Sequence, residues 1–149
     1  MQLISFLSVA ITAWSLCVSV SARPTNTANG VVSLAQMEAW VNAQEPGSVK
    51  VIGDPFGKLA PRAAGDVTVA TCTAKSGTTC SGCTVQTGSN QCLDVPGTKC
   101  IFSTDQVSFC DRSGCGGSCN EINSCGTRLD GGACDTPGTN SVSLPFGGF

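Results

Sequence analysis

Residues 72–100 read CTAKSGTTCSGCTVQTGSNQCLDVPGTKC, and this stretch decides the fold because five cysteines fall within it. Five more follow, and the whole set has the spacing C-x7-C-x2-C-x8-C-x7-C-x9-C-x4-C-x3-C-x5-C-x8-C. In a secreted chain, an even number of cysteines in so short a span is typical of a disulfide scaffold. The spacing leaves the pairing open, but we expect each of these ten residues to be bonded: Cys72, Cys80, Cys83, Cys92, Cys100, Cys110, Cys115, Cys119, Cys125 and Cys134.

The sequence between the cysteines favours strands. Residues 66–71 alternate in the manner of a strand, and residues 140–146 predict another. Residues 100–103 and 106–110 flank Thr104-Asp105, which predicts a hairpin turn. The intervening Gly, Ser, Thr and Asn residues are typical of turns and loops. We therefore expect a small disulfide-rich, mainly β fold with little helix outside the N-terminal third.

Two parts of the cysteine-rich segment resemble each other. CLDVPGT at residues 92–98 is similar to CDTPGT at residues 134–139, and VATC at residues 69–72 is similar to VSFC at residues 107–110. Because Pro-Gly-Thr is common turn chemistry, coincidence is the alternative explanation. The similarity predicts two related β units, which would span residues 66–104 and 105–146.

The N-terminus has the features of a signal peptide over residues 1–22. Residues 3–20 are apolar and uncharged, and Val20-Ser21-Ala22 supplies small residues for cleavage. A transmembrane anchor is the alternative, but Ser and Thr dilute the apolar run and no cytoplasmic Lys/Arg flank follows to hold an orientation. Cleavage would remove Cys17 and leave the even set of ten. We therefore expect a secreted, extracellular protein.

Residues 23–62 form a cysteine-free segment that we interpret as a pro-segment. Ser33 and Gln36 have the spacing of a capping box at the start of a helix that Pro46-Gly47 would end. The segment closes with Leu59-Ala60-Pro61-Arg62, which resembles the Leu-x-x-Arg site at which kexin-like proteases remove pro-domains from fungal secreted effectors. Leu59 and Arg62 would then direct cleavage to give a mature domain of residues 63–149, whereas the alternative is an exposed arginine in a linker.

The composition argues against metal, redox and hydrolytic chemistry. The chain has no histidine, so the pair Cys80/Cys83 lacks the second ligand pair of a zinc site. It also lacks the helical context of a thioredoxin-type thiol. Asp94, Asp111, Asp130 and Asp135 could supply a carboxylate pair, but each lies in a sequence where aspartate commonly stabilises a turn. We expect no catalytic residue, no metal, no cofactor and no enzymatic activity.

From Ala63 onward the chain has four basic and seven acidic residues, a net charge of −3. No basic cluster interrupts this part. Nucleic acid and anionic membranes attract concentrated Lys and Arg, so neither is an expected partner. We expect a monomer that binds protein.

The full layout resembles fungal small secreted cysteine-rich proteins, the class from which plant- and insect-directed effectors are drawn. This resemblance rests on the signal peptide, the pro-segment, the Leu59–Arg62 motif and the even cysteine set. It implies a non-enzymatic effector that binds a protein of a host or competitor outside the cell. An inhibitor of secreted proteases is a second hypothesis, with Lys99 or Arg112 as the inserted residue of an inhibitory loop. An antimicrobial or toxin-like protein is a third, although membrane-active proteins are mostly cationic.

Overall fold

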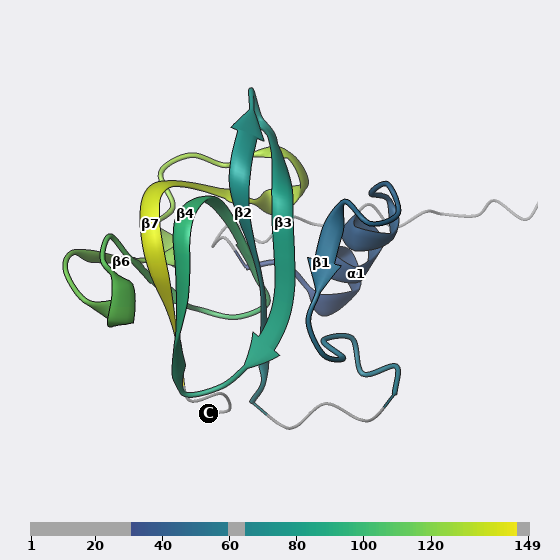
Figure 1. Ribbon diagram of the computed structural model, residues 1–149, viewed down its shortest axis with the longest axis horizontal. Coiled ribbons are helices and arrows are strands. Elements are labelled where there is room, and N and C mark those ends of the chain that lie inside the picture. Colours follow the sequence, from purple (N-terminus) through teal and green to yellow (C-terminus); the bar gives the residue numbers. More distant parts are fainter. Residues whose placement is uncertain (1–30, 60–64, 146–149) are drawn as a thin grey trace, which may run out of the picture.

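The computed structural model describes residues 31–59 and 65–145, and its main element is a seven-stranded sheet in the order β1-β3-β2-β4-β7-β5-β6 (Figure 1). One helix, α1 (Leu34–Asn42), accompanies the sheet, with 3-10 turns at Ser113–Cys115, Ile122–Ser124 and Asp130–Gly132. The strands are β1 (Val49–Val51), β2 (Val67–Ser76), β3 (Thr79–Gly88), β4 (Gln91–Ser103), β5 (Ser108–Cys110), β6 (Cys119–Glu121) and β7 (Cys134–Leu144). The expected small, mainly β, disulfide-rich fold is confirmed.

All ten cysteines between Cys72 and Cys134 are paired, as their even number predicts. The bonds are Cys72–Cys83, Cys80–Cys100, Cys92–Cys115, Cys110–Cys119 and Cys125–Cys134. Cys72–Cys83 and Cys110–Cys119 join neighbouring strands, and Cys80–Cys100 links β3 to β4 across β2. The other two bonds tie a loop to a strand.

Strands β2–β4 and β5–β7 share one topology and one register. β2 lies between β3 and β4, and β5 lies between β6 and β7. Cys72 pairs in register with Cys83, to which it is disulfide-bonded, and Cys110 pairs in the same way with Cys119. The Cα atoms of both bonded pairs are 4.0 Å apart. We call residues 66–104 the first unit and residues 105–145 the second unit.

The two units meet where β4 pairs with β7, and the Thr98–Thr139 pair lies at the centre of this seam. On one side of that pair β4 contains two more residues than the strand it faces, and on the other side β7 contains two more. Thr98 Oγ1 donates to the Val95 carbonyl at 2.7 Å, and Thr139 Oγ1 donates to the Thr136 carbonyl at 2.9 Å. The two Pro-Gly-Thr sequences thus form equivalent bulges, which is more than isolated turns would show.

The predicted hairpin across Thr104-Asp105 is wrong. β4 and β5 follow each other in sequence, but β7 lies between them and pairs with both. Thr104 N–H donates instead to the Thr68 carbonyl at 3.0 Å, which directs the chain away from β4. Short-range sequence signals could not reveal this because β7 arrives from about 30 residues downstream.

Residues 31–59 pack mainly on the first unit and share an apolar cluster with Leu129 and Ala133 of the second unit. Ser33 caps α1 through the predicted capping box with Gln36, and Met37 is buried against the sheet. β1 adds a parallel strand to β3 at the edge of the sheet, and α1 lies next to β1 on that side in Figure 1. Leu59 is exposed, whereas Arg62, Cys17 and the expected signal peptide lie outside the described residues. Within residues 31–59 and 65–145, no helix has the length and apolar character needed to cross a membrane.

Candidate functional site

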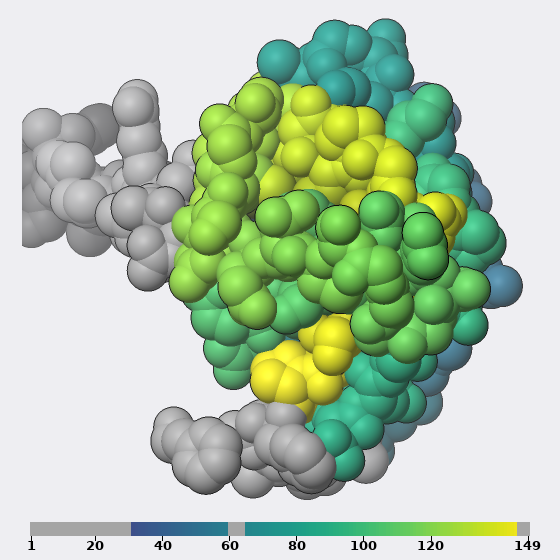
Figure 2. All heavy atoms as spheres, turned by 90° about the vertical axis from the view of Figure 1, so that its left-hand side faces the viewer, coloured from purple at the N-terminus to yellow at the C-terminus, as the bar shows by residue number. Residues whose placement is uncertain are grey.

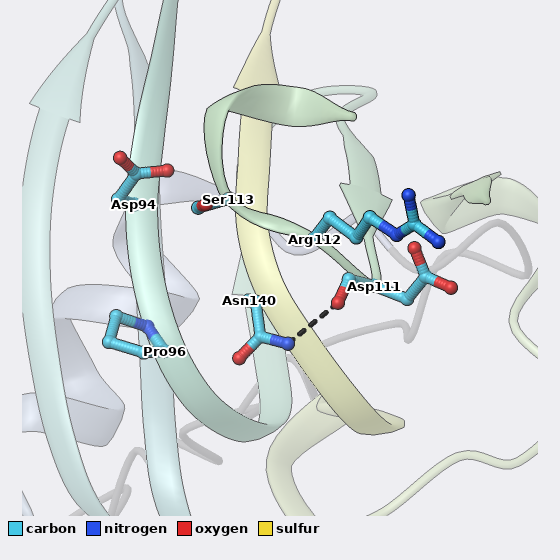
Figure 3. Close-up of a pocket in the computed structure, with 6 residues that line it drawn as sticks. All are labelled: Asp94, Pro96, Asp111, Arg112, Ser113 and Asn140. Carbon is cyan, nitrogen blue, oxygen red and sulfur yellow. Dashed lines mark hydrogen bonds between the residues drawn. The ribbon is translucent and has the colours of Figure 1, made fainter. Parts of the chain in front are cut away.

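An open cleft of about 470 Å³ lies between β4, β7 and the chain that leaves β5. Figure 3 shows Asp94 and Pro96 on one side and Asp111 and Arg112 on the other, with Asn140 between them. In Figure 2 the green segment that contains this chain lies across the yellow strand β7. The lining residues are Asp94, Pro96, Asp111, Arg112, Ser113 and Asn140.

Two disulfides hold the clamped loop, which we define as residues 111–118. Cys110–Cys119 closes its base, and Cys92–Cys115 ties its middle to β4. Gly117 has a φ of +78°, and a Cβ there would meet Asp111 Oδ1 at 2.0 Å, so a side chain does not fit. The loop is therefore ordered by its covalent anchors and by a turn that requires glycine.

Hydrogen bonds fix the loop against both strands. Asp94 Oδ1 accepts from Gly114 N–H at 2.6 Å, and Asp111 Oδ1 accepts from Ser118 N–H at 2.9 Å. The Asn140 side chain donates to the Asp111 carbonyl at 2.6 Å (dashed in Figure 3). Asp94 and Asp111 thus stabilise turns, as expected of them, and each leaves one carboxylate oxygen without a hydrogen bond in the described structure.

Ser141 is the buried support of this loop. Its hydroxyl accepts from Cys115 N–H at 2.9 Å and donates to the Arg112 carbonyl, and the residue is fully buried in β7. Both bonds are lost if the hydroxyl is removed, which leaves a backbone donor and acceptor with no partner.

We expect Ser141→Ala to lower the free energy of unfolding by about 1–3 kcal/mol, because two part-buried hydrogen bonds worth about 0.5–1.5 kcal/mol each are lost. Chemical denaturation measures this change, and amide exchange at Cys115 should accelerate with it. Ser143→Ala is the matched control, since Ser143 lies two residues further along β7 and is half-buried. Equal stability losses in the two variants would show that Ser141 does not support the loop.

Arg112 is the exposed cation of the cleft. Its backbone is extended, with φ −121° and ψ 159°, and its side-chain stem lies over Gly117. The guanidinium forms no ion pair within the described residues, so it is available to a partner. Arg128 is also exposed but lies outside the cleft, and partial burial lowers the pKa of its guanidinium.

Comparison with known families, curated proteins and solved structures finds no match to this chain. No group of three or more Cys, Asp or Glu side chains is placed to hold a metal ion among the residues described. The other two aspartates weighed in the sequence lie elsewhere: Asp130 accepts from Thr78 and Thr79, and Asp135 pairs with Lys75.

The two residues predicted for an inhibitory loop lie in different settings. Lys99 is exposed but lies within β4, between β2 and β7 in the sheet, and not on a loop. Arg112 does lie on a loop closed by disulfides, as the hypothesis requires. Its carbonyl, however, accepts a hydrogen bond from the Ser141 hydroxyl.

Sequence reasoning missed Pro96, Ser113, Asn140 and Ser141 as parts of one site. The internal similarity held a usable signal for two of them. Where the first unit has Lys99-Cys100 after Pro-Gly-Thr, the second has Asn140-Ser141. This difference between the two units indicated that the polar residues of β7 have a role that their counterparts in β4 do not have.

Proposed function

We propose that the chain is a secreted, non-enzymatic binding protein that recognises an extracellular protein of a host or competitor through the clamped loop and its cleft. The main support for this proposal is that the clamped loop is held rigidly and presents the Arg112 guanidinium, which forms no ion pair within the described residues. The disulfides and hydrogen bonds fix the loop backbone before binding, so little conformational entropy is lost when a partner docks.

The charges of the cleft support recognition of a polar protein surface. Arg112 offers a planar guanidinium suited to a carboxylate, and arginine is enriched among residues that dominate binding energy. Asp94 and Asp111 each retain a carboxylate oxygen that could accept from a basic side chain. The expected partner therefore presents an acidic group next to a basic one.

Protease inhibition is less well supported. A substrate-like inhibitor offers the carbonyl of its inserted residue to the oxyanion hole of the protease. The Arg112 carbonyl accepts instead from Ser141, and Lys99 is part of the sheet. Assays with trypsin-like and papain-like enzymes test this alternative, and inhibition lost on replacing Arg112 would favour it over the binding protein proposed above.

Arg112→Glu is expected to weaken partner binding by about 30-fold, corresponding to the roughly 2 kcal/mol typical of a dominant interface residue. The immobilised protein is used to capture proteins from host extracellular fluid or from medium shared with competing microbes. Affinity for the captured protein is then measured for each variant.

Arg128→Glu makes the same charge change on an exposed residue outside the cleft and is the matched control. The proposal requires the control to keep wild-type affinity. A partner that binds wild type and Arg112→Glu equally well would contradict it.

A further inference from the structure

The sheet face under α1 is apolar, whereas the equivalent face of the second unit is polar. Ala70 pairs with Val85 and Phe102, and all three are at most 1% exposed. The residues at the equivalent register positions of the second unit are Ser108, Glu121 and Ser143. There the Ser108 hydroxyl donates to the Glu121 carboxylate at 2.7 Å, and no helix of the described structure covers it. The first unit thus differs from its counterpart by having a face built to be covered.

We define the helix groove as the surface formed by Ala70, Val85, Phe102, Leu129 and Ala133. Residues 31–57 fill it mainly through apolar contacts. Met37 is 1% exposed, and the Trp40 ring lies 4.5 Å from the Phe102 ring between centroids. Gly131 completes the contact because it lies against both rings, where a Cβ would be 3.2 Å from Trp40.

Main-chain bonds align the same segment with the sheet. Val32 N–H donates to the Ser103 carbonyl at 2.8 Å, and Ile52 N–H donates to the Val85 carbonyl at 2.8 Å. β1 pairs with β3 over three residues. None of the five disulfides involves residues 31–59, and Lys58 pairs with Glu38 inside the segment itself. The segment is therefore held by non-covalent contacts and by its peptide linkage to β2.

We propose that the helix groove is a second binding site, which takes an amphipathic helix of an extracellular protein once the linkage after Arg62 is cut. The partner helix would present large apolar side chains one turn apart, as Met37 and Trp40 do, followed by a short extended segment that pairs with β3. Residues 31–59 are then the competitor that keeps the site closed before the cut.

Cleavage after Arg62 would open the groove by lowering the local concentration of residues 31–59. A short linker gives the segment an effective concentration on the order of 1 mM at its groove. After the cut, the segment competes only at the concentration of the secreted protein, so dilution below its dissociation constant empties the groove. A site that is closed in the intact chain thereby becomes available without any other change in the fold.

The test uses the full secreted chain with a specific protease site placed between Leu59 and Asp66. The folded protein is cut and then diluted to about 10 nM, a concentration at which micromolar complexes dissociate. Trp14 lies in the expected signal peptide, so Trp40 is the sole tryptophan of the secreted chain and reports departure from Phe102. A labelled synthetic peptide of residues 31–59 is the probe for the empty groove.

We expect a red shift of Trp40 emission on dilution of the cut protein alone, with the cooperative melt of the disulfide-bonded sheet retained. The labelled peptide should bind the cut protein at least about 100-fold more tightly than the intact one, because the tethered segment competes. The peptide with Met37→Asp should bind at least about tenfold more weakly than the wild-type peptide.

Three results would overturn the proposal: equal binding of the peptide to cut and intact protein, equal binding of the two peptides, or loss of the cooperative melt when the segment leaves. Arg112→Glu in the cut protein should leave peptide binding unchanged. This result would show that binding at the helix groove does not depend on the cleft, so the two proposals can fail independently.

Discussion

Reduction of the five disulfides is expected to unfold the protein at a temperature where the oxidised protein is fully folded. Each bridge contributes about 2–4 kcal/mol, whereas the net stability of a small domain is about 5–15 kcal/mol. The core that would remain consists of two modest apolar clusters on a chain with few large side chains. The five bridges together contribute about 10–20 kcal/mol, which equals or exceeds the net stability typical of such a domain.

Circular dichroism with and without a phosphine reductant measures this effect, with mass spectrometry of the alkylated product to show that all ten thiols are free. The oxidised protein, treated identically but without reductant, is the control. A reduced chain that still melts cooperatively would show that the apolar clusters suffice, contrary to this account.

Met37→Asp is expected to detach α1 from the sheet. Met37 is 1% exposed, so the substitution places a carboxylate in an apolar site and removes the contacts of a large side chain. A cost of about 4 kcal/mol, in the range for such core changes, corresponds to roughly 1,000-fold faster amide exchange in α1. Hydrogen exchange of the intact chain resolves this effect, and the amides of β2 should stay protected.

Ala39→Asp introduces the same residue on the exposed side of α1 and is the matched control. It should cost only about 0.5–1 kcal/mol, the difference in helix propensity. If Met37→Asp exchanged no faster than Ala39→Asp, the helix would not depend on the groove.

The cysteines and the β-branched runs predicted the fold class. An even number of cysteines indicates complete pairing, and β-branched residues favour strands through local conformational preference. The helix was also predictable, since Ser33, Gln36 and Pro46-Gly47 mark its ends. The placement of β7 between β4 and β5 was not, because strand order depends on pairings between distant residues that no local pattern encodes.

Single residues of the site could be predicted from the sequence, but their proximity in the fold could not. Arg112 and the two cleft aspartates stood out by charge, but their convergence depends on the Cys92–Cys115 bond, one of many pairings that the spacing allowed. The sequence also did not reveal that residues 31–59 cover the helix groove. A helix with apolar residues on one face needs a partner, and the sequence could not show that this partner is the sheet that follows it.

Hydrogen exchange of the intact protein with and without its captured partner tests the central claim most directly, because it locates the contact on the chain. In the intact chain the helix groove is occupied, so contact is expected at the clamped loop alone. We predict slower exchange at residues 111–118 and 94–97, with no change in α1. Protection confined to α1 or β3, with none at residues 111–118, would contradict the account.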